Sequence, residues 1–479
     1  MSLLVPFDRY TWPMKNKEHT PYSHQKETTI FLIRNKRSFV LNDLGTGKTL
    51  SALWACDFLK LNGKIKKVLI SSPLSTIKSV WGNEIFFNFI NRKYALAHGR
   101  REERALAIKA DVDFVIINHD GLVTMENELL REKFDVFIID ELTAFKNHKT
   151  DRYKSAKKIA DKCKAVWGMT AEPTPNSPVE AYGQAKVVND QNPFLPPLFT
   201  KYRDMVEEKI TTHISMPVLG AEKIVHKILQ PSIRFERDKC IDIPPCQYID
   251  LEVTMTDAQK KAYEQMRKQL VIEYKDGLIT AANAAVKAMK LTQVACGWVK
   301  DDEGNVHELD SKIRLDELWE IYLNTHKSKL IVFTGFRAAV EGVTKFFKDK
   351  KVNAEFIHGS VGQTKRANLI NEFQNGALNV LVIQPQSSSH GITLTAADTV
   401  VWHSLVPSGE VHRQANGRIT RIGQTRKQTI IRMIGCQAER RIAKILDNKG
   451  RMSDGTLALF AQPDDVSYDS SNKWVWWNF

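Results

Sequence analysis

Short, unbroken apolar runs alternate with longer stretches of helical periodicity along the first 170 residues. Five runs have the length and the β-branched content of strands: RSFVL (37–41), KVLIS (67–71), DFVIIN (113–118), DVFIID (135–140) and AVWGMT (165–170). Continuous apolar positions are typical of strands buried on both faces of a parallel sheet. The lengths between them suit right-handed crossover helices, so the pattern predicts an α/β domain.

The same pattern returns in the last third of the chain. Five further runs predict strands there: KLIVFTGF (329–336), VNAEFIHG (352–359), NVLVIQ (379–384), TVVWHS (399–404) and QTIIRMIG (428–435). There is no direct sequence repeat between the two sets, so only the alternation of elements recurs. The chain is therefore predicted to hold two parallel-sheet domains in tandem.

The segment between these sets has a different composition. Residues 191–200 are rich in proline and predict irregular structure. Residues 256–296 are rich in alanine, lysine and glutamine and contain no proline, which predicts two helices, capped by Asp or Thr. The polar residues 301–310 predict a loop. The expected domains are 1–230 and 311–479, joined by a linker and helical insertion at 231–310.

The segment LNDLGTGKTL (41–50) lies between the first predicted strand and a predicted helix. It ends as phosphate-binding loops do, although Asn42 stands where the usual motif begins with glycine. Its backbone N–H groups would cradle phosphates at the start of the helix. Lys48 would reach the β- and γ-phosphates, and the hydroxyl of Thr49 would bind Mg²⁺. The predicted nucleotide-binding residues are Gly45, Thr46, Gly47, Lys48 and Thr49.

An acidic pair, Asp140 and Glu141, ends the buried run VFIID. A carboxylate in this position is costly unless it faces an ion or a water-filled cleft. One interpretation is a helix N-cap after the strand. The other, which the phosphate loop upstream favours, gives Asp140 the magnesium ion through water and makes Glu141 the base that orients the attacking water.

The net charge of +14, with an isoelectric point near 9.3, favours an anionic polymer as partner. A solvated basic surface is the alternative. The six cysteines are scattered without the spacing of a zinc site, which predicts reduced thiols. No apolar run approaches the roughly 18 residues that span a bilayer, and the N-terminus lacks a signal pattern. These observations predict an intracellular protein without a membrane partner.

The run HRQANGRITRIGQTR (412–426) contains two arginines three residues apart, Arg418 and Arg421. On a helix they would share a face. Two guanidinium groups on one face suit a triphosphate whose charge is being redistributed. A basic helix at the surface, or one that touches nucleic acid, is the alternative.

This run resembles the arginine-finger motif of helicase superfamily two in its Swi/Snf form, which reads Q-x-x-G-R-x-x-R-I-G-Q. The matching residues are Gln414, Gly417, Arg418, Arg421, Ile422, Gly423 and Gln424. The loop NDLGTGKT likewise resembles the family's D-E-M-G-L-G-K-T, which also lacks a leading glycine. The resemblance implies two RecA-like domains and makes Arg418 and Arg421 catalytic.

Further matches follow in the family's order, so the resemblance covers roughly residues 20–440. YSHQKETTIFL (22–32) resembles the adenine-reading motif, with Gln25 as the candidate, and residues 68–85 resemble the motif that carries Pro73 and Trp81. Residues 115–122, 168–178, 357–374 and 387–404 resemble motifs for DNA contact and coupling, which adds Gly391 to the expected nucleotide site.

Three positions depart from the family pattern. Thr143 replaces the histidine that usually couples hydrolysis to DNA, and Ala171 and Glu172 replace Gly-Thr in the coupling motif. The family's G-G-x-G-L-N-L keeps only Gly391 and Leu394. These changes bear on the strength of coupling more than on hydrolysis itself.

The resemblance implies an ATP- and Mg²⁺-dependent translocase on double-stranded DNA, a monomer in the cytoplasm, or in the host cytoplasm if a phage encodes it. Two alternatives stay open: a strand-separating or annealing helicase, and a non-catalytic nucleic-acid-binding protein on a motor fold. The compact size resembles phage and bacterial members of the family. The tail NKWVWWNF (472–479) holds three tryptophans that would stack on bases or dock on the chain's own surface.

Overall fold

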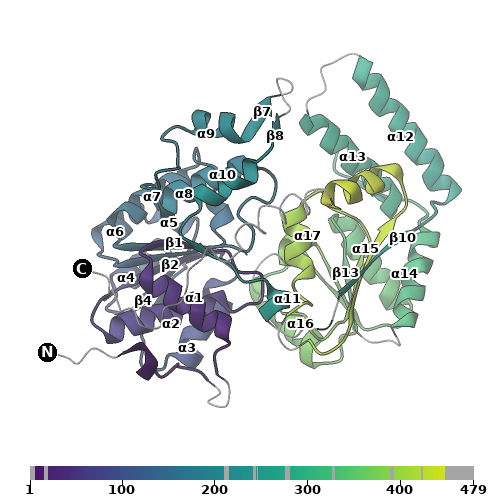
Figure 1. Cartoon of the computed structure of the whole chain (residues 1–479). Helices are drawn as coiled ribbons and strands as arrows, with labels where there is room; N and C mark the ends of the chain where they lie inside the picture. Colours follow the sequence, from purple (N-terminus) through teal and green to yellow (C-terminus); the bar gives the residue numbers. More distant parts are fainter. Residues whose placement is uncertain are drawn as a thin grey trace. The chain divides into compact units, whose positions relative to one another are not determined.

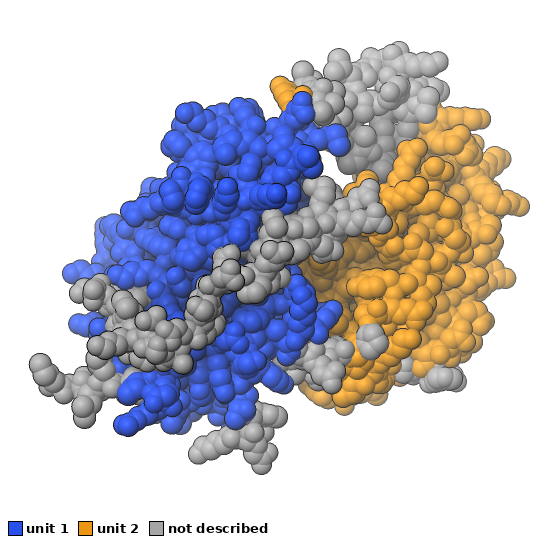
Figure 2. All heavy atoms as spheres, in the orientation of Figure 1, with its two compact units in different colours: residues 1–208, 215–242, 452–479 blue, residues 209–214, 243–451 orange. Residues whose placement is uncertain are grey.

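A computed structural model describes residues 6–15, 20–209, 215–240, 244, 246–275, 281–301, 303–325, 329–388, 393–421 and 424–447. The chain divides into two compact units, with the change from one to the other after residue 242 (Figure 2). Each unit is built on its own sheet (Figure 1). Within the described ranges, no helix has the length and apolar character that a bilayer crossing requires.

The first unit contains a sheet that has seven strands among the described residues, in the order β3-β4-β2-β5-β6-β1-β9, all parallel. Its strands are β1 (Arg37–Val40), β2 (Val68–Ser72), β3 (Tyr94–Ala97), β4 (Phe114–Asn118), β5 (Val136–Asp140), β6 (Ala165–Met169) and β9 (Ser232–Ile233). The five strands predicted for this region are all present, which confirms the α/β prediction.

Helices cover both faces of this sheet because successive strand residues point in opposite directions. In β4, for example, Phe114 and Ile116 join one apolar core, whereas Val115 and Ile117 join the other. The first core is closed by α1 (Ser23–Arg34), α2 (Lys48–Leu61), η2 (Ile77–Gly82) and α3 (Asn83–Asn88). The second is closed by α4 (Arg101–Lys109), α5 (Gly121–Thr124), α6 (Glu126–Arg131), η3 (Leu142–Phe145), α7 (Asp151–Lys162), α8 (Ala181–Val188), α9 (Phe199–Val206) and α10 (Ala221–Ile228).

Smaller elements complete the first unit and its margin. They are η1 (Phe7–Arg9), η4 (Pro178–Glu180), the paired strands β7 (Glu207–Lys209) and β8 (Ser215–Pro217), and α11 (Arg237–Cys240). Of the residues 191–200 predicted to be irregular, 191–198 form turns and irregular structure, whereas the last two already belong to α9.

The second unit contains a parallel sheet that has six strands within the described part of the chain, in the order β10-β17-β16-β13-β15-β14. The strands are β10 (Cys246–Glu252), β13 (Leu330–Phe333), β14 (Ala354–Ile357), β15 (Val380–Ile383), β16 (Thr399–Trp402) and β17 (Gln428–Ile434). Around them lie α14 (Lys312–Asn324), α15 (Arg337–Asp349), α16 (Gln363–Asn375), η5 (Pro385–Ser388), α17 (Gly409–Asn416) and a helix over residues 437–447. The second predicted sheet is thus confirmed.

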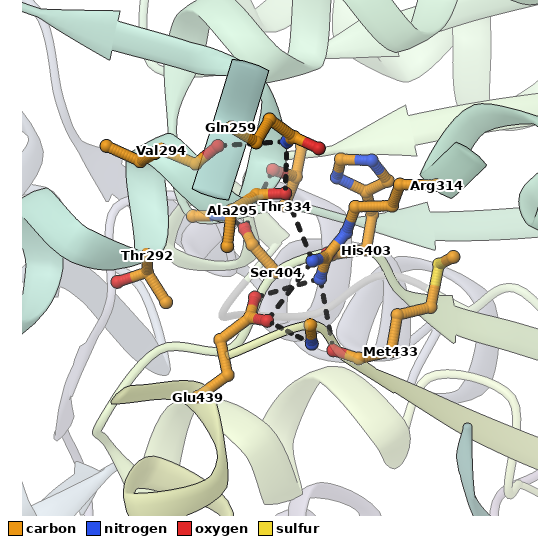
Figure 3. A network of polar contacts seen from close by, with 12 residues as sticks. Gln259, Thr292, Val294, Ala295, Arg314, Thr334, His403, Ser404, Met433 and Glu439 are labelled. Atoms are coloured by element: carbon orange, nitrogen blue, oxygen red, sulfur yellow. Dashed lines mark hydrogen bonds and ion pairs between the residues drawn. The ribbon is translucent and has the colours of Figure 1, made fainter. Parts of the chain in front are cut away.

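The two helices predicted for residues 256–296 are also present, as α12 (Asp257–Lys275) and α13 (Ala281–Cys296). Thr256 caps α12, since its hydroxyl accepts from the backbone N–H of Gln259 at 3.2 Å while the Gln259 side chain accepts from Thr256 N at 3.0 Å. The Gln259 amide nitrogen donates to the carbonyls of Val294 and Ala295, at 3.0 Å each, which joins the helices (Figure 3).

The prediction of a loop over residues 301–310 is wrong in part. β12 (Val306–Glu308) pairs with β11 (Trp298–Lys300) in an antiparallel hairpin, with Gly304 at φ 97° in the turn. The backbone N–H of Asn305 is satisfied by the carboxylate of Asp301 at 2.7 Å. Polar turn residues therefore mark the tip of a hairpin rather than an open loop.

Candidate functional site

The sheet order of the first unit brings the phosphate loop and the acidic pair to one edge. β6 lies between β1 and β5, and all three run parallel, so the residues that follow them emerge together. Thr170, which follows β6, is joined to the end of β1 at this edge, because its backbone N–H donates to the carbonyl of Val40 at 3.1 Å. The structure thus places the segment after β1 and Asp140 at the carboxyl edge of the same sheet.

The phosphate loop requires glycine at two positions. Gly45 and Gly47 have φ of 84° and 83°, which side chains rarely adopt, and α2 begins directly afterwards at Lys48. A Cβ atom on Gly47 would also lie 2.1 Å from the side-chain nitrogen of Gln25. The ammonium of Lys48 folds over the loop and donates to the carbonyls of Asn42, at 2.7 Å, and Asp43, at 3.1 Å.

Two side chains of α1 hold the loop from one side. His24 Nε2 and Gln25 Nε2 donate to the carbonyl of Thr46, at 3.0 Å and 3.3 Å. Burial lowers the pKa of His24, which favours the neutral imidazole. Because a carbonyl only accepts, Nε2 carries the proton in this contact. Gln25, expected to read adenine, is here buried against the phosphate loop.

Asn42, in the place of the usual first glycine, is a buried structural residue. Its amide nitrogen donates to the hydroxyl of Thr28 at 2.9 Å, and its amide oxygen accepts from the backbone N–H of Phe235 at 2.9 Å. The departure from the glycine motif therefore gives the loop two side-chain hydrogen bonds that glycine could not make.

A segment far along the chain, residues 232–237, holds the loop from the other side. The backbone N–H groups of Leu41 and Asp43 donate to the carbonyls of Ile233 and Phe235, at 2.8 Å and 3.0 Å. The carboxylate of Asp43 accepts from the Arg234 guanidinium at 2.9 Å and from the backbone N–H of Arg237 at 3.0 Å. Sequence reasoning missed this segment, because a two-residue strand leaves no periodic signal.

The acidic pair stands at the end of β5. One oxygen of Asp140 accepts a hydrogen bond from the indole N–H of Trp81 at 2.9 Å. Glu141 has φ 53° and ψ 60°, a left-handed conformation that costs a residue with a side chain about 1 kcal/mol or more. Such strain concentrates at functional sites, which favours the catalytic interpretation over a simple helix cap. Thr143, where the family has histidine, is buried in η3.

The side chains at this edge fit a magnesium ion. Thr49 lies in the first turn of α2, and Asp140 ends β5, so a hydroxyl and a carboxylate belong to the segments at the carboxyl edge. Oxygen donors from one or two side chains, completed by phosphate oxygens, are the usual protein environment of Mg²⁺.

In the second unit, the prediction that Arg418 and Arg421 share a helical face is wrong. α17 ends at Asn416, and both arginines lie in the turns that follow. The carbonyl of Arg418 accepts from the backbone N–H of Leu394 at 2.9 Å instead of continuing a helix. Arg418 is buried, and Arg421 donates to the carbonyl of Gly417 at 3.1 Å and to the hydroxyl of Thr393 at 3.3 Å.

The structure describes only some of the other residues that the sequence predicts for the nucleotide site of the second unit. Gln414 lies on α17 and is buried. Gln424 fixes the arginine turns, since its amide nitrogen donates to the carbonyl of Ala397 at 2.8 Å. Gly391, Ile422, Gly423 and the tryptophan-rich tail lie outside the described residues.

Comparison with known families gives two matches that together span most of the chain. Residues 24–297 match the SNF2-related domain, and residues 313–423 match the helicase conserved C-terminal domain. The first match covers more than half of the chain and contains the phosphate loop and the acidic pair. The second contains Arg418 and Arg421.

Relatives with curated records include proteins of phages, bacteria and eukaryotes. A protein named p41 from Acyrthosiphon pisum secondary endosymbiont phage 1 is 27% identical over 86% of this chain and 90% of its own length. An ATP-dependent DNA helicase of Arabidopsis thaliana, DDM1, is 24% identical over 87% of this chain and 58% of its own length. A human DNA annealing helicase and endonuclease is 24% identical over 95% of this chain but 42% of its own length. The chain thus spans about half the length of these last two relatives.

Among solved structures, the SWI2/SNF2 ATPase core of Sulfolobus solfataricus in complex with double-stranded DNA is 21% identical, with a TM-score of 0.45, over 94% of this chain and 97% of that one. A second structure, of the SWI2/SNF2 ATPase core domain from the same organism, is 20% identical, with a TM-score of 0.42, over 92% of this chain and 91% of that one.

Proposed function

Because the chain belongs to the SNF2-related family of ATPases, we propose that it couples ATP hydrolysis to movement along double-stranded DNA. The observation that carries this proposal is the site at the carboxyl edge of the first sheet. There a phosphate loop, held from both sides, and an acidic pair with a strained Glu141 stand at the ends of strands that are separated by only one other strand.

Each side chain at this edge has a definite task in hydrolysis. The N–H groups at the start of α2 bind phosphate oxygens, and Lys48 exchanges the loop carbonyls for the β- and γ-phosphates. Thr49 and Asp140 would hold magnesium, which supplies positive charge to the phosphates when bound. Glu141 orients the attacking water and receives its proton.

The arginines of the second unit complete the proposed machine. Arg418 and Arg421 contact the γ-phosphate of ATP held by the first unit and stabilise the charge that develops during transfer. ATP binding then draws the units together, and hydrolysis releases them. Repeated closing and opening moves a DNA duplex that both units grip, largely through its phosphates, so movement is independent of sequence.

The charge of the chain and the names of its relatives support DNA as the polymer along which the protein moves. The net charge of +14 favours a polyanion. Two relatives are named as an ATP-dependent DNA helicase and as a DNA annealing helicase and endonuclease. Annealing or strand separation is the second candidate, favoured by the human relative's name, and the experiment below separates it from translocation.

Duplex DNA is expected to stimulate the ATPase, and the moving protein is expected to displace the third strand of a triplex without separating the duplex. Phosphate release, with and without duplex, single-stranded DNA or RNA, measures the first effect. Gel separation of labelled strands measures the second. Because phosphate contacts dominate, DNA affinity should fall steeply with salt, by about 0.9 logarithmic units per tenfold salt for each phosphate neutralised. Unwinding of a duplex, or stimulation by RNA alone, would favour the helicase alternative.

Removing either arginine is expected to lower turnover about tenfold or more while ATP affinity changes little, since most nucleotide contacts come from the first unit. The measurement compares basal turnover, ATP affinity and DNA affinity for Arg418→Ala and Arg421→Ala. Arg440→Ala is the control, because Arg440 is an exposed arginine paired with Glu252 at 2.6 Å. If the two arginines grip DNA instead, their removal weakens DNA binding and leaves basal turnover intact.

A further inference from the structure

Trp81 is a buried side chain that reaches the acidic pair from another part of the first unit. It is 0% exposed, and its indole N–H donates to the carboxylate of Asp140 at 2.9 Å across 59 residues of sequence. An indole has one donor and no acceptor, so this contact fixes the direction of one carboxylate oxygen of Asp140.

The backbone around Trp81 holds the ring in this position. β2 pairs with β5, so the segment after Ser72 starts beside the end of β5. The hydroxyl of Thr76 donates to the carbonyl of Pro73 at 2.8 Å, and the backbone N–H of Trp81 donates to the carbonyl of Thr76 at 3.1 Å. Residues 77–82 form a π-helix, a rare conformation that is frequently found at functional sites.

Packing in the apolar core also fixes the orientation of the indole ring. Trp81 belongs to the apolar core that also contains Ile77, Ile85 and Ile138, so the indole cannot turn away without opening that core. A fixed donor that holds a carboxylate in one orientation suits a metal site. When few protein oxygens bind an ion, the affinity for that ion depends on the direction in which those oxygens point.

We propose that Trp81 is a positioning residue that holds the Asp140 carboxylate in the orientation required for magnesium and its bound water. This inference rests on the function proposed above. The chemistry is carried by Asp140, and Trp81 acts through it. Loss of the indole N–H should therefore reduce the affinity for magnesium more than it reduces the affinity for the nucleotide itself.

The chain provides a matched control in Trp167. Its side chain is also 0% exposed in the first unit, and its indole N–H also donates a hydrogen bond, at 3.0 Å. The acceptor is the backbone carbonyl of Asn35, which precedes β1 and so lies at the amino edge of the sheet, away from the acidic pair. Trp81→Phe and Trp167→Phe thus remove the same donor from opposite edges.

The experiment measures magnesium dependence in two ways in the full chain: ATPase rate against Mg²⁺ concentration, and binding of a fluorescent ATP analogue with and without Mg²⁺. Trp81→Phe is expected to raise the half-saturating Mg²⁺ concentration about tenfold or more, as loss of a partner of a metal ligand does. Analogue affinity in EDTA should stay at the wild-type value. Trp167→Phe should leave both quantities unchanged.

An Asp140→Asn variant separates failure of this inference from failure of the proposed function. If Asp140→Asn shifts the magnesium dependence but Trp81→Phe behaves as Trp167→Phe does, Trp81 is a core residue and the inference is overturned. If Asp140→Asn itself leaves the magnesium dependence unchanged, Asp140 is not the metal-binding carboxylate, and both the magnesium role proposed for Asp140 and the inference about Trp81 fall. Thermal unfolding of each variant verifies that the first unit is folded.

Discussion

Lys48→Ala is expected to lower ATP hydrolysis by more than about a hundredfold, the scale of loss when one preorganised donor is removed from developing negative charge. The first unit should remain folded. Lys48 starts α2 directly after the left-handed Gly47, so its stem leaves the loop at the point where phosphates would bind. Alanine preserves the helix but removes the only part of this side chain that can neutralise a phosphate.

The same ammonium also donates to the carbonyls of Asn42 and Asp43, so a structural effect of Lys48→Ala has to be separated from a catalytic one. Those carbonyls lie in a loop that α1 and residues 232–237 already hold, which predicts a small change in thermal stability. Phosphate release and thermal unfolding are measured together, with Lys66→Ala as control because Lys66 is an exposed lysine of the same unit. A folded Lys48→Ala protein with near wild-type turnover would remove this loop from the catalytic site.

The central strands were predictable because each is a continuous apolar run. β4 and β6 are buried at every position, and only strands covered on both faces show that pattern. The edge strands were not predictable in the same way. β10 is mostly exposed and β9 has two residues, so neither has an apolar run to detect. Their positions depend on pairing with β17 and β1, which only the folded chain shows.

The catalytic candidates were predictable for a similar reason, since a phosphate loop and a carboxylate after a buried strand are local features. Their supporting residues are distant in sequence. Phe235 donates to Asn42 across 193 residues, and Trp81 donates to Asp140 across 59. Residue spacing gave a wrong prediction in the arginine motif. The three-residue interval from Arg418 to Arg421 suits a helix, yet the carbonyl of Arg418 accepts a hydrogen bond from the backbone N–H of Leu394.

The second large effect is expected in the stability of the second unit, where Arg314 and Glu439 form a buried ion pair (Figure 3). The side chains are 2% and 0% exposed, with two contacts of 2.8 Å and 3.1 Å. Arg314 also donates to the carbonyls of Met433, at 3.1 Å, and His403, and Glu439 accepts from the backbone N–H of Gly435 at 2.7 Å. Burial alone would lower the pKa of Arg314, but the adjacent carboxylate raises it, so the guanidinium stays charged.

Glu439→Ala is therefore expected to lower the free energy of unfolding of the second unit by about 3–5 kcal/mol, since it leaves a buried guanidinium without its counter-charge. Hydrogen exchange read by mass spectrometry measures this loss locally, in peptides from β16 and β17, while peptides from the first sheet serve as an internal reference. Glu252→Ala is the matched control: its partner is Arg440, both side chains are more than half exposed, and the expected loss is about 0–1 kcal/mol.

A double variant distinguishes an unpaired charge from a lost hydrogen bond. If the loss in Glu439→Ala comes from the stranded guanidinium, Arg314→Met combined with Glu439→Leu should recover most of the stability, because neither charge then needs a partner. If the loss comes instead from the hydrogen bond to Gly435, the double variant should be at least as unstable as Glu439→Ala, since Gly435 stays without its partner and the carbonyls of Met433 and His403 lose theirs. Protection in β16 and β17 that stays at the wild-type level in Glu439→Ala would show that this pair contributes nothing to holding the strand ends and α14 together.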